Sequence, residues 1–242
     1  MFKAINLIVS MFIYLIGINN ILNKSQKLKE EGKIKQRDEL LLSEANKWAE
    51  MVLNKAGVNL IVKGKENLID EPCLYVSNHQ SNFDIPILVK SVDKMAGFIA
   101  KKELGKIPIL SKWILEVGSI LIDRNNPREA LKGIKEGING LKNGRSLVIF
   151  PEGTRSKDGE VLEFKAGSMK LAIKAGVKII PISINGSTNI MKSGSFKINS
   201  GDVFVNILKP IDVSEFSKEE QKSMASYVEN LIREDINAQK NK

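Results

Sequence analysis

The sequence is poor in the residues that form disulfides and transition-metal sites. Among its 242 residues there is one cysteine and one histidine. A single cysteine excludes an intrachain disulfide, and one cysteine with one histidine cannot supply the ligand cluster of a zinc site. We therefore expect a chain that works in a reducing compartment, with no bound metal and no cofactor.

Several nucleotide-binding and nucleic-acid-binding patterns are also missing. There is no phosphate loop of the Gly-x4-Gly-Lys type, no Gly-x-Gly-x-x-Gly fingerprint, no zinc-finger spacing and no platform of basic and aromatic residues. Lysine and arginine number 37 against 28 acidic residues, which gives a net charge of +9. With nucleic acid disfavoured, this excess predicts an anionic substrate or an anionic membrane as the partner.

The only histidine, His79, lies five residues before Asp84. Histidine is the side chain best suited to move protons near neutral pH, and a carboxylate is its usual orienting partner. Five residues along a regular helix would turn the two side chains to different faces, so they can meet only if residues 79–83 form a loop. The alternative is that Asp84 only caps a helix that begins near Pro86, while His79 is a solvated loop residue.

Polar or cationic residues follow four predicted strands at the point where each strand ends. The apolar runs 74–77, 95–100, 119–122 and 146–150 are each typical of a buried strand. The residues that follow them include His79, the pair Lys101 and Lys102, Arg124, and Arg155. Because ligands bind at the carboxyl ends of parallel strands, this pattern predicts a site at that edge of a parallel sheet.

Four blocks of this sequence, in order across about residues 58–210, resemble the glycerolipid acyltransferases, most closely the 1-acylglycerol-3-phosphate acyltransferases. They are Asn-His-Gln-Ser-Asn-Phe-Asp at 78–84, Gly-Ser-Ile-Leu-Ile-Asp-Arg at 118–124, Phe-Pro-Glu-Gly-Thr-Arg-Ser at 150–156 with Phe-Lys-Ala-Gly at 164–167, and Val-Lys-Ile-Ile-Pro-Ile at 177–182. A lone His-x4-Asp is a weak signal, whereas four ordered blocks are a strong one.

The resemblance implies transfer of an acyl group from a thioester to the sn-2 hydroxyl of lysophosphatidic acid, which makes phosphatidic acid. His79 would be the general base and Asp84 would orient it. The lone Cys73 lies outside the blocks, and no serine sits in a Gly-x-Ser-x-Gly elbow, so we expect direct attack without an acyl-enzyme.

The same resemblance implies a phosphate-binding set and an acceptor-binding set of residues. Arg155 and Arg124 would clamp the acceptor phosphate, because a guanidinium fork matches its geometry, and three lysines would add positive field. These lysines are Lys101, Lys102 and Lys165. Residues expected to bind the acceptor or the developing oxyanion are Glu152, Gly153, Thr154 and Asn78, although Glu152 can equally be a structural acid paired with a nearby lysine or arginine.

The N-terminal segment predicts a membrane anchor. Residues 4–22 are mostly apolar and about long enough to cross a bilayer, but Asn6, Ser10, Asn19 and Asn20 interrupt them. A charged stretch at 24–39 and a helical pattern at 40–55 follow. Either the first helix spans the membrane or the two helices dip into one leaflet. The resemblance favours the second arrangement, with the catalytic domain on the cytoplasmic side of the cell membrane and lysines 24–35 near anionic headgroups.

The expected fold is α/β, with a central, mostly parallel sheet flanked by helices, as in glycerol-3-phosphate acyltransferases. We expect an anchoring motif at 1–56 and a catalytic domain at 57–242. Further strands are expected at 58–62, 178–184 and 203–208, and helices from 84, at 108–116, from 127 to a stop at Gly144, and at 217–239. Gly133, Gly137 and Gly140 would let the 127–143 helix pack closely on the sheet.

Two other functions fit the same residues. One is a related acyltransferase with another acceptor, such as glycerol-3-phosphate or a different lysolipid. The other is a non-catalytic module that binds anionic lipids. The acyl donor, coenzyme A or acyl carrier protein, and the oligomeric state are not specified by the sequence.

Overall fold

The computed structural model describes residues 2–123 and 126–240, and its centre is a seven-stranded sheet in the order β1-β7-β6-β2-β5-β3-β4. The strands β6, β2, β5, β3 and β4 are mutually parallel, while β7 runs antiparallel to β6 and carries β1 parallel to itself. The strands are β1 Val58–Lys63, β2 Cys73–Ser77, β3 Ala96–Lys101, β4 Ile120–Ile122, β5 Ser146–Ile149, β6 Lys178–Asn185 and β7 Gly201–Ile207. The predicted α/β class with a mostly parallel sheet is confirmed.

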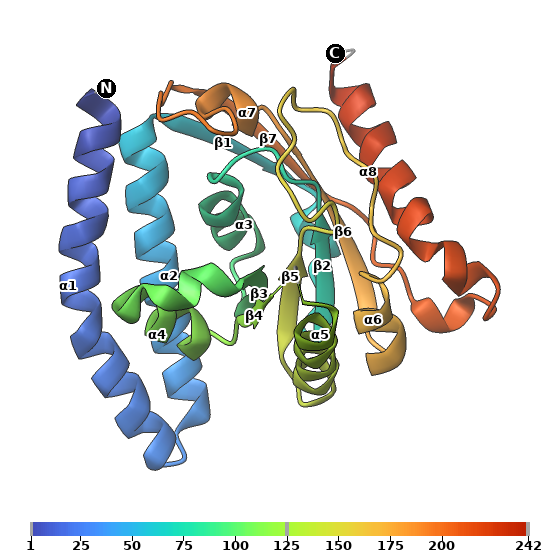
Figure 1. The fold of residues 1–242 in the computed structure, drawn as a ribbon, viewed down its shortest axis with the longest axis horizontal. Helices are drawn as coiled ribbons and strands as arrows, with labels where there is room; N and C mark the ends of the chain where they lie inside the picture. The colour runs from blue at the N-terminus through green and yellow to red at the C-terminus, as the bar shows by residue number, and fades with distance from the viewer. Residues whose placement is uncertain (1, 124–125, 241–242) are drawn as a thin grey trace.

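Helices cover both faces of this sheet (Figure 1). The α-helices are α1 Phe2–Glu30, α2 Ile34–Ala56, α3 Asp84–Val92, α4 Pro108–Glu116, α5 Pro127–Lys142, α6 Lys170–Ala175, α7 Ser187–Ile190 and α8 Met224–Lys240. Short 3-10 helices lie at η1 Lys65–Asn67, η2 Lys102–Lys106, η3 Val213–Glu215 and η4 Glu220–Ser223.

Side chains alternate along the central strands and build one apolar layer on each face of the sheet. In β2, Leu74 and Val76 face a cluster shared with α5, α6 and α8, whereas Tyr75 faces a cluster shared with α2 and α3. Both layers are buried, so the central strands are apolar on both faces, as parallel sheets require. This is why the sequence shows continuous apolar runs there.

Helices α1 and α2 form a hairpin whose inner side packs on the domain. Ile18 of α1, Leu41 of α2 and Trp113 of α4 form a third small apolar cluster. The charged stretch 24–39 is mostly helical and is divided by a turn at residues 31–33. The hairpin therefore consists of two long helices that lie side by side and are joined by this turn (Figure 1).

Some local expectations were wrong. The C-terminal helix starts at Met224 rather than Ser217, because short 3-10 helices at Val213–Glu215 and Glu220–Ser223 precede it. Asp212 accepts from the Ser214 N–H, and the Ser217 hydroxyl accepts from the Glu220 N–H. Gly133 and Gly137 do pack closely, since an added Cβ would lie 2.7 Å from Ile122 and 2.6 Å from Leu171. At Gly140 an added Cβ would have, of the described part of the chain, only Arg145 within 4 Å, at 3.8 Å, so close packing does not explain that glycine.

Candidate active site

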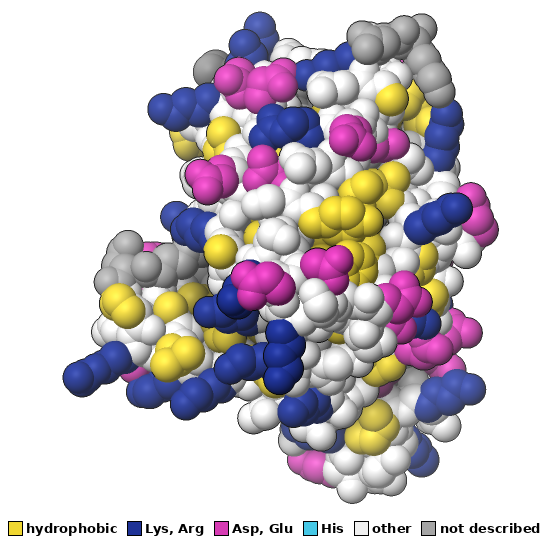
Figure 2. All heavy atoms as spheres, turned by 90° about the vertical axis from the view of Figure 1, so that its right-hand side faces the viewer, with side chains coloured by type: hydrophobic (Ala, Val, Ile, Leu, Met, Phe, Trp, Pro, Cys, Tyr) yellow, Lys and Arg dark blue, Asp and Glu magenta, His cyan; other side chains and the backbone are white. Residues whose placement is uncertain are grey.

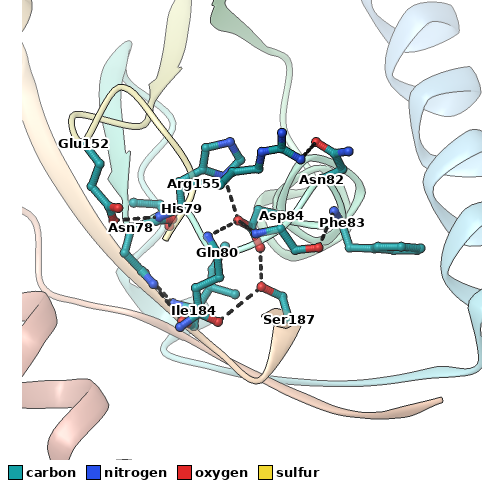
Figure 3. Close-up of polar contacts among 12 residues, drawn as sticks. Asn78, His79, Gln80, Asn82, Phe83, Asp84, Glu152, Arg155, Ile184 and Ser187 are labelled. Atoms are coloured by element: carbon teal, nitrogen blue, oxygen red, sulfur yellow. Dashed lines mark hydrogen bonds and ion pairs between the residues drawn. The ribbon is translucent and has the colours of Figure 1, made fainter. Parts of the chain in front are cut away.

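The structure brings His79 and Asp84 together. Residues between the end of β2 and the start of α3 form a loop, and Nδ1 of His79 lies 2.7 Å from Oδ2 of Asp84 (Figure 3). A carboxylate can only accept, so Nδ1 carries the hydrogen and Nε2, the ring nitrogen turned away from Asp84, carries the lone pair. The imidazole also stacks on Phe150, with ring centroids 4.0 Å apart and planes 13° apart.

Asp84 is not a helix cap. Its Oδ2 accepts hydrogen bonds from the backbone N–H groups of Gln80 and Ser81, at 2.6 and 2.8 Å, which precede the helix instead of lying in its first turn. Its other oxygen, Oδ1, accepts from the hydroxyl of Ser187. The carboxylate is fully buried. These hydrogen bonds fix the orientation of the Asp84 carboxylate toward the His79 ring.

Ser187 was not among the predicted site residues. It lies in α7, directly after β6, and β6 is parallel to β2. The same rule that selected the other four strand ends would have selected the end of this fifth strand. Ser187 could therefore be predicted from the sequence by its position after β6.

The loop after β5 is bonded to the His79 loop at several points. Glu152 accepts from the backbone N–H of His79 at 2.8 Å, and the Ser156 N–H donates to the carbonyl of His79 at 2.8 Å. The Arg155 guanidinium donates to the side-chain oxygen of Asn82 at 2.7 Å. These contacts join the two strongest sequence motifs into one structure at the carboxyl ends of β2 and β5.

Glu152 is a buried acid with an unusual proton affinity. Burial, opposed by the backbone N–H groups of His79 and Leu162, raises the pKa of its carboxyl to about 8. Among the described residues it forms no ion pair with a lysine or arginine, so the paired structural acid considered above is not what the structure contains. Glu152 instead accepts a hydrogen bond from the backbone of the His79 loop.

Gly153 allows a lysine to lie over the turn that follows β5. Its φ is +71°, and an added Cβ would lie 2.6 Å from Nζ of Lys165. The Gly153 N–H itself donates to the Phe150 carbonyl at 3.1 Å. Any other residue would strain the backbone and displace the Lys165 ammonium.

The remaining predicted site residues differ in burial, and one of them lies outside the described residues. Asn78 is buried, and its side-chain amide bonds both the N–H and the carbonyl of Ile184, each at 2.9 Å. Thr154 is exposed. Lys101 and Lys102 are exposed at the end of β3, where Lys102 lies 3.6 Å from Asp123. Arg124 lies outside the described residues.

Cys73 lies at the opposite end of β2 from the site. It is the first residue of this strand, whereas His79 follows the last, and it is fully buried. Burial raises the pKa of its thiol, although hydrogen bonds from Tyr75 and Ser146 oppose the shift. A buried thiol at the other end of the strand has no part in the chemistry at His79.

An imidazole oriented by a buried carboxylate, at the carboxyl edge of a parallel sheet and beside a guanidinium group, has the geometry that a general base requires in an α/β fold. The Acyltransferase family model matches residues 59–185, which is more than half of the chain. The chain therefore belongs to the Acyltransferase family.

Individual relatives are consistent with that membership. The chain is 42% identical over 153 residues to the 1-acyl-sn-glycerol-3-phosphate acyltransferase BAT2, chloroplastic, of Brassica napus, covering 62% of this chain and 44% of that protein. It is 37% identical over 164 residues to the 1-acyl-sn-glycerol-3-phosphate acyltransferase of Salmonella typhimurium, covering 67% of this chain and 66% of that one. Thus the matches span less than two thirds of these two relatives.

A solved structure resembles the chain over its whole length. The crystal structure of the 1-acyl-sn-glycerophosphate (LPA) acyltransferase PlsC from Thermotoga maritima has a TM-score of 0.88 and 30% sequence identity, and the match covers 100% of this chain and 96% of that one. The N-terminal hairpin and the sheet are therefore both included in the similarity.

Proposed function

We propose that this protein transfers a fatty acyl group from an acyl thioester to the sn-2 hydroxyl of lysophosphatidic acid and so makes phosphatidic acid. The observation that carries the proposal is the His79–Asp84 pair, with its carboxylate buried and held by three further donors. The names of the relatives supply the acceptor, and the excess positive charge of the chain suits its phosphate.

In this reaction Nε2 of His79 takes the proton of the acceptor hydroxyl as the new carbon–oxygen bond forms. Asp84 keeps the ring in the required tautomer and stabilises the imidazolium. The carbon–sulfur bond then breaks, and the imidazolium returns its proton to the leaving thiolate. Because alcohols are much weaker acids than imidazolium, proton transfer accompanies attack instead of preceding it.

We assign the acceptor phosphate to cationic residues that follow the strands of the sheet. Arg155 is placed beside the His79 loop by Asn82, and Lys165 lies over the Gly153 turn. We assign these two residues, with Arg124 and the strand-end lysines Lys101 and Lys102, to the phosphate-binding set. Thr154 is exposed, so its hydroxyl and N–H can meet the substrate, whereas the amide of Asn78 and the N–H of Gly153 already have partners and serve to position the loops.

The α1–α2 hairpin anchors the protein in one membrane leaflet. Helix α1 is long and apolar enough to cross a bilayer, by length and composition. Its inner side, however, packs on α2, where Tyr14 donates to the backbone carbonyl of Glu44 and Asn6 accepts from Lys55. A span through the whole bilayer would carry these charged residues of α2 into hydrocarbon, whereas a hairpin at the surface of one leaflet does not. The catalytic domain would then lie on the cytoplasmic side.

The test is thiol release from acyl-coenzyme A or acyl carrier protein by purified protein in detergent, with and without lysophosphatidic acid. We expect acceptor-dependent release and phosphatidic acid as the lipid product. His79→Ala should lower turnover by at least about 100-fold with lipid binding retained, whereas Lys132→Ala, on the exposed side of α5, should not.

Two results would contradict the proposal in different ways. Release that depends on glycerol-3-phosphate or another lysolipid instead would keep the chemistry and change the acceptor. Absence of release with both donors and all these acceptors, together with unchanged lipid binding in His79→Ala, would instead support a non-catalytic lipid-binding module.

A further inference from the structure

A short basic loop connects α7 to β7, and both of its ends are fixed. Residues 191–200 contain two lysines and no acidic residue. At the base, the Asn199 N–H donates to the carbonyl of Ile190 at 2.9 Å, and its side chain donates to the carbonyl of Asn189 at 3.0 Å. Met191 and Ile198 pack on the apolar cluster between the sheet and α2. The loop is therefore closed and anchored by its apolar residues.

The tip of this loop presents a large aromatic side chain to the outside. Phe196 is 82% exposed, the highest fraction among the large apolar side chains described. A tight turn precedes it, in which the Ser195 N–H donates to the carbonyl of Lys192 and Gly194 has a φ of +80°. Since Met191 and Ile198 of the same loop are partly buried, the outward position of Phe196 comes from a defined turn. Lys192 and Lys197, on either side, are also exposed.

This loop lies beside the N-terminal end of α1. Lys3 Nζ donates to the Ser200 hydroxyl at 2.5 Å, and Leu7 of α1 is buried in the same apolar cluster as Met191 and Ile198. The outer side of α1 carries a stripe of apolar residues at helical spacing that are all more than half exposed: Ile5, Ile8, Val9, Phe12, Ile13 and Ile16. The base of the loop at Ser200, four residues after Phe196, therefore contacts the first turn of the helix that carries this stripe.

The opposite side of the protein differs in character. The face that carries α8 shows lysine, arginine and carboxylate side chains interspersed over most of its area, with one larger central apolar patch and several smaller apolar areas among them (Figure 2). On the α1 side, residues 4–23 contain no charged residue at all, and the adjacent loop adds only positive charge. An exposed aromatic between two lysines matches the boundary between hydrocarbon and anionic headgroups.

We propose that the loop formed by residues 192–197 is a second membrane contact, in which Phe196 enters the interface and Lys192 and Lys197 bind anionic lipid headgroups. The proposal rests on the anchoring of the α1–α2 hairpin proposed above and adds a site outside that hairpin. The partner is an anionic lipid surface, because the loop is positively charged and its base contacts the first turn of α1, whose exposed apolar stripe is itself proposed to enter the membrane.

The loop is also connected to the catalytic loop. The Ser81 hydroxyl donates to the carbonyl of Met191 at 2.8 Å, and Ser187, at the start of α7, bonds Asp84. A lipid contact at Phe196 would therefore hold the His79 region against the surface in which the acceptor lies. It should affect access to membrane-borne acceptor and leave the chemical step unchanged.

The first test places an environment-sensitive fluorophore at single cysteines in the full-length chain, with the buried Cys73 retained. The labelled variants are Phe196→Cys, Phe12→Cys on the stripe of α1, and Leu131→Cys on α5. On vesicles of equal parts phosphatidylglycerol and phosphatidylcholine we expect a blue shift at positions 196 and 12 and none at 131. A shift at 12 without one at 196 overturns the loop contact and keeps the hairpin anchor, and no shift at either overturns both.

The second test measures vesicle partitioning and turnover. Phe196→Ala should weaken partitioning about tenfold and Phe196→Trp should preserve it, while Lys192→Gln and Lys197→Gln should each cost about fivefold on the anionic vesicles only. For Phe196→Ala the KM for vesicle-borne acceptor should rise with kcat unchanged, and turnover in detergent should match the parent protein. An equal loss of turnover in detergent, or unchanged partitioning of Phe196→Ala, would overturn the proposal.

Discussion

At the scale of single residues, the site depends on how Asp84 is held. Its carboxylate accepts hydrogen bonds from two backbone N–H groups and the Ser187 hydroxyl, in addition to the one from His79. Backbone donors are rigid, so they fix the carboxylate at little entropic cost, and the carboxylate in turn fixes the ring. Buried groups behind the imidazole therefore set the geometry of the His79 ring.

We expect Asp84→Asn to lower kcat by roughly 10²–10⁴-fold, because an amide can donate to Nδ1 and so favour the wrong tautomer. Ser187→Ala removes one of the donors and should cost about tenfold. Thr188→Val is the matched control, since the buried Thr188 hydroxyl next to it has no hydrogen-bond partner among the residues that the structure describes, and its activity should be unchanged. Steady-state kinetics with circular dichroism to check folding would measure all three. Full activity of Asp84→Asn would contradict the dyad.

At the scale of elements, sequence patterns located the long segments well and the short ones poorly. The apolar runs mark all seven strands, and Asn126 and Pro127 mark the start of α5, where Asn126 caps the N–H groups of Arg128 and Glu129. Helices α6 and α7, of six and four residues, are too short to show a period, so they were not predicted. The bond between Asn78 and Ile184 depends on the register of β2 against β6, which no local pattern encodes. Likewise the His-x4-Asp spacing predicted a loop between the two residues, but it did not predict which groups donate hydrogen bonds to Asp84.

A partly buried charge cluster joins the hairpin to α4. Arg37 of α2 donates to the carboxylate of Glu116 at 2.7 and 3.0 Å and to its backbone carbonyl at 2.8 Å, and Ser25 of α1 donates to the same carboxylate at 2.7 Å. Although burial alone would raise the pKa of Glu116, the hydrogen bonds from Ser25 and Arg37 lower it. The carboxylate of Glu116, at the end of α4, thus accepts hydrogen bonds from both helices of the hairpin.

Removing that clamp should loosen the hairpin more than the sheet. We expect Arg37→Ala to destabilise by about 2 kcal/mol, because it leaves a partly buried carboxylate without its cation. Lys132→Ala, which breaks an exposed pair with Glu129, should cost about 0.5 kcal/mol or less. Urea unfolding gives the energies, and hydrogen exchange should show faster exchange in α1 and α2 with strands β2 and β5 unchanged. Equal effects of the two substitutions would show that the clamp contributes nothing.

At the scale of the whole molecule, the charge that suits the surface to a membrane differs from the buried acidic groups in the interior. The net charge of +9 and the apolar outer side of α1 suit an anionic membrane surface. Inside, the loops that carry the site are held by buried polar groups, among them Asp84 and Glu152. A buried acid that stays protonated avoids the cost of a buried charge, but it makes global stability depend on pH.

Glu152 allows that dependence to be measured. Because its pKa in the folded protein is raised to about 8 from a usual value of 4.5, the folded state binds the proton more tightly than the unfolded state between those limits. Stability attributable to Glu152 is therefore fully present below about pH 4.5 and is lost as pH rises toward 8, with a slope of at most about 1.4 kcal/mol per pH unit. Glu152→Gln keeps the acceptor for the His79 N–H and cannot ionise, so its stability relative to the parent should increase across that window and level off above it. Urea unfolding from pH 5 to pH 9, with Glu163→Gln as the exposed control, measures the difference. Parallel stability curves for the parent and Glu152→Gln would mean that the carboxyl titrates normally in the folded protein, and that the catalytic loop is supported by a charged residue.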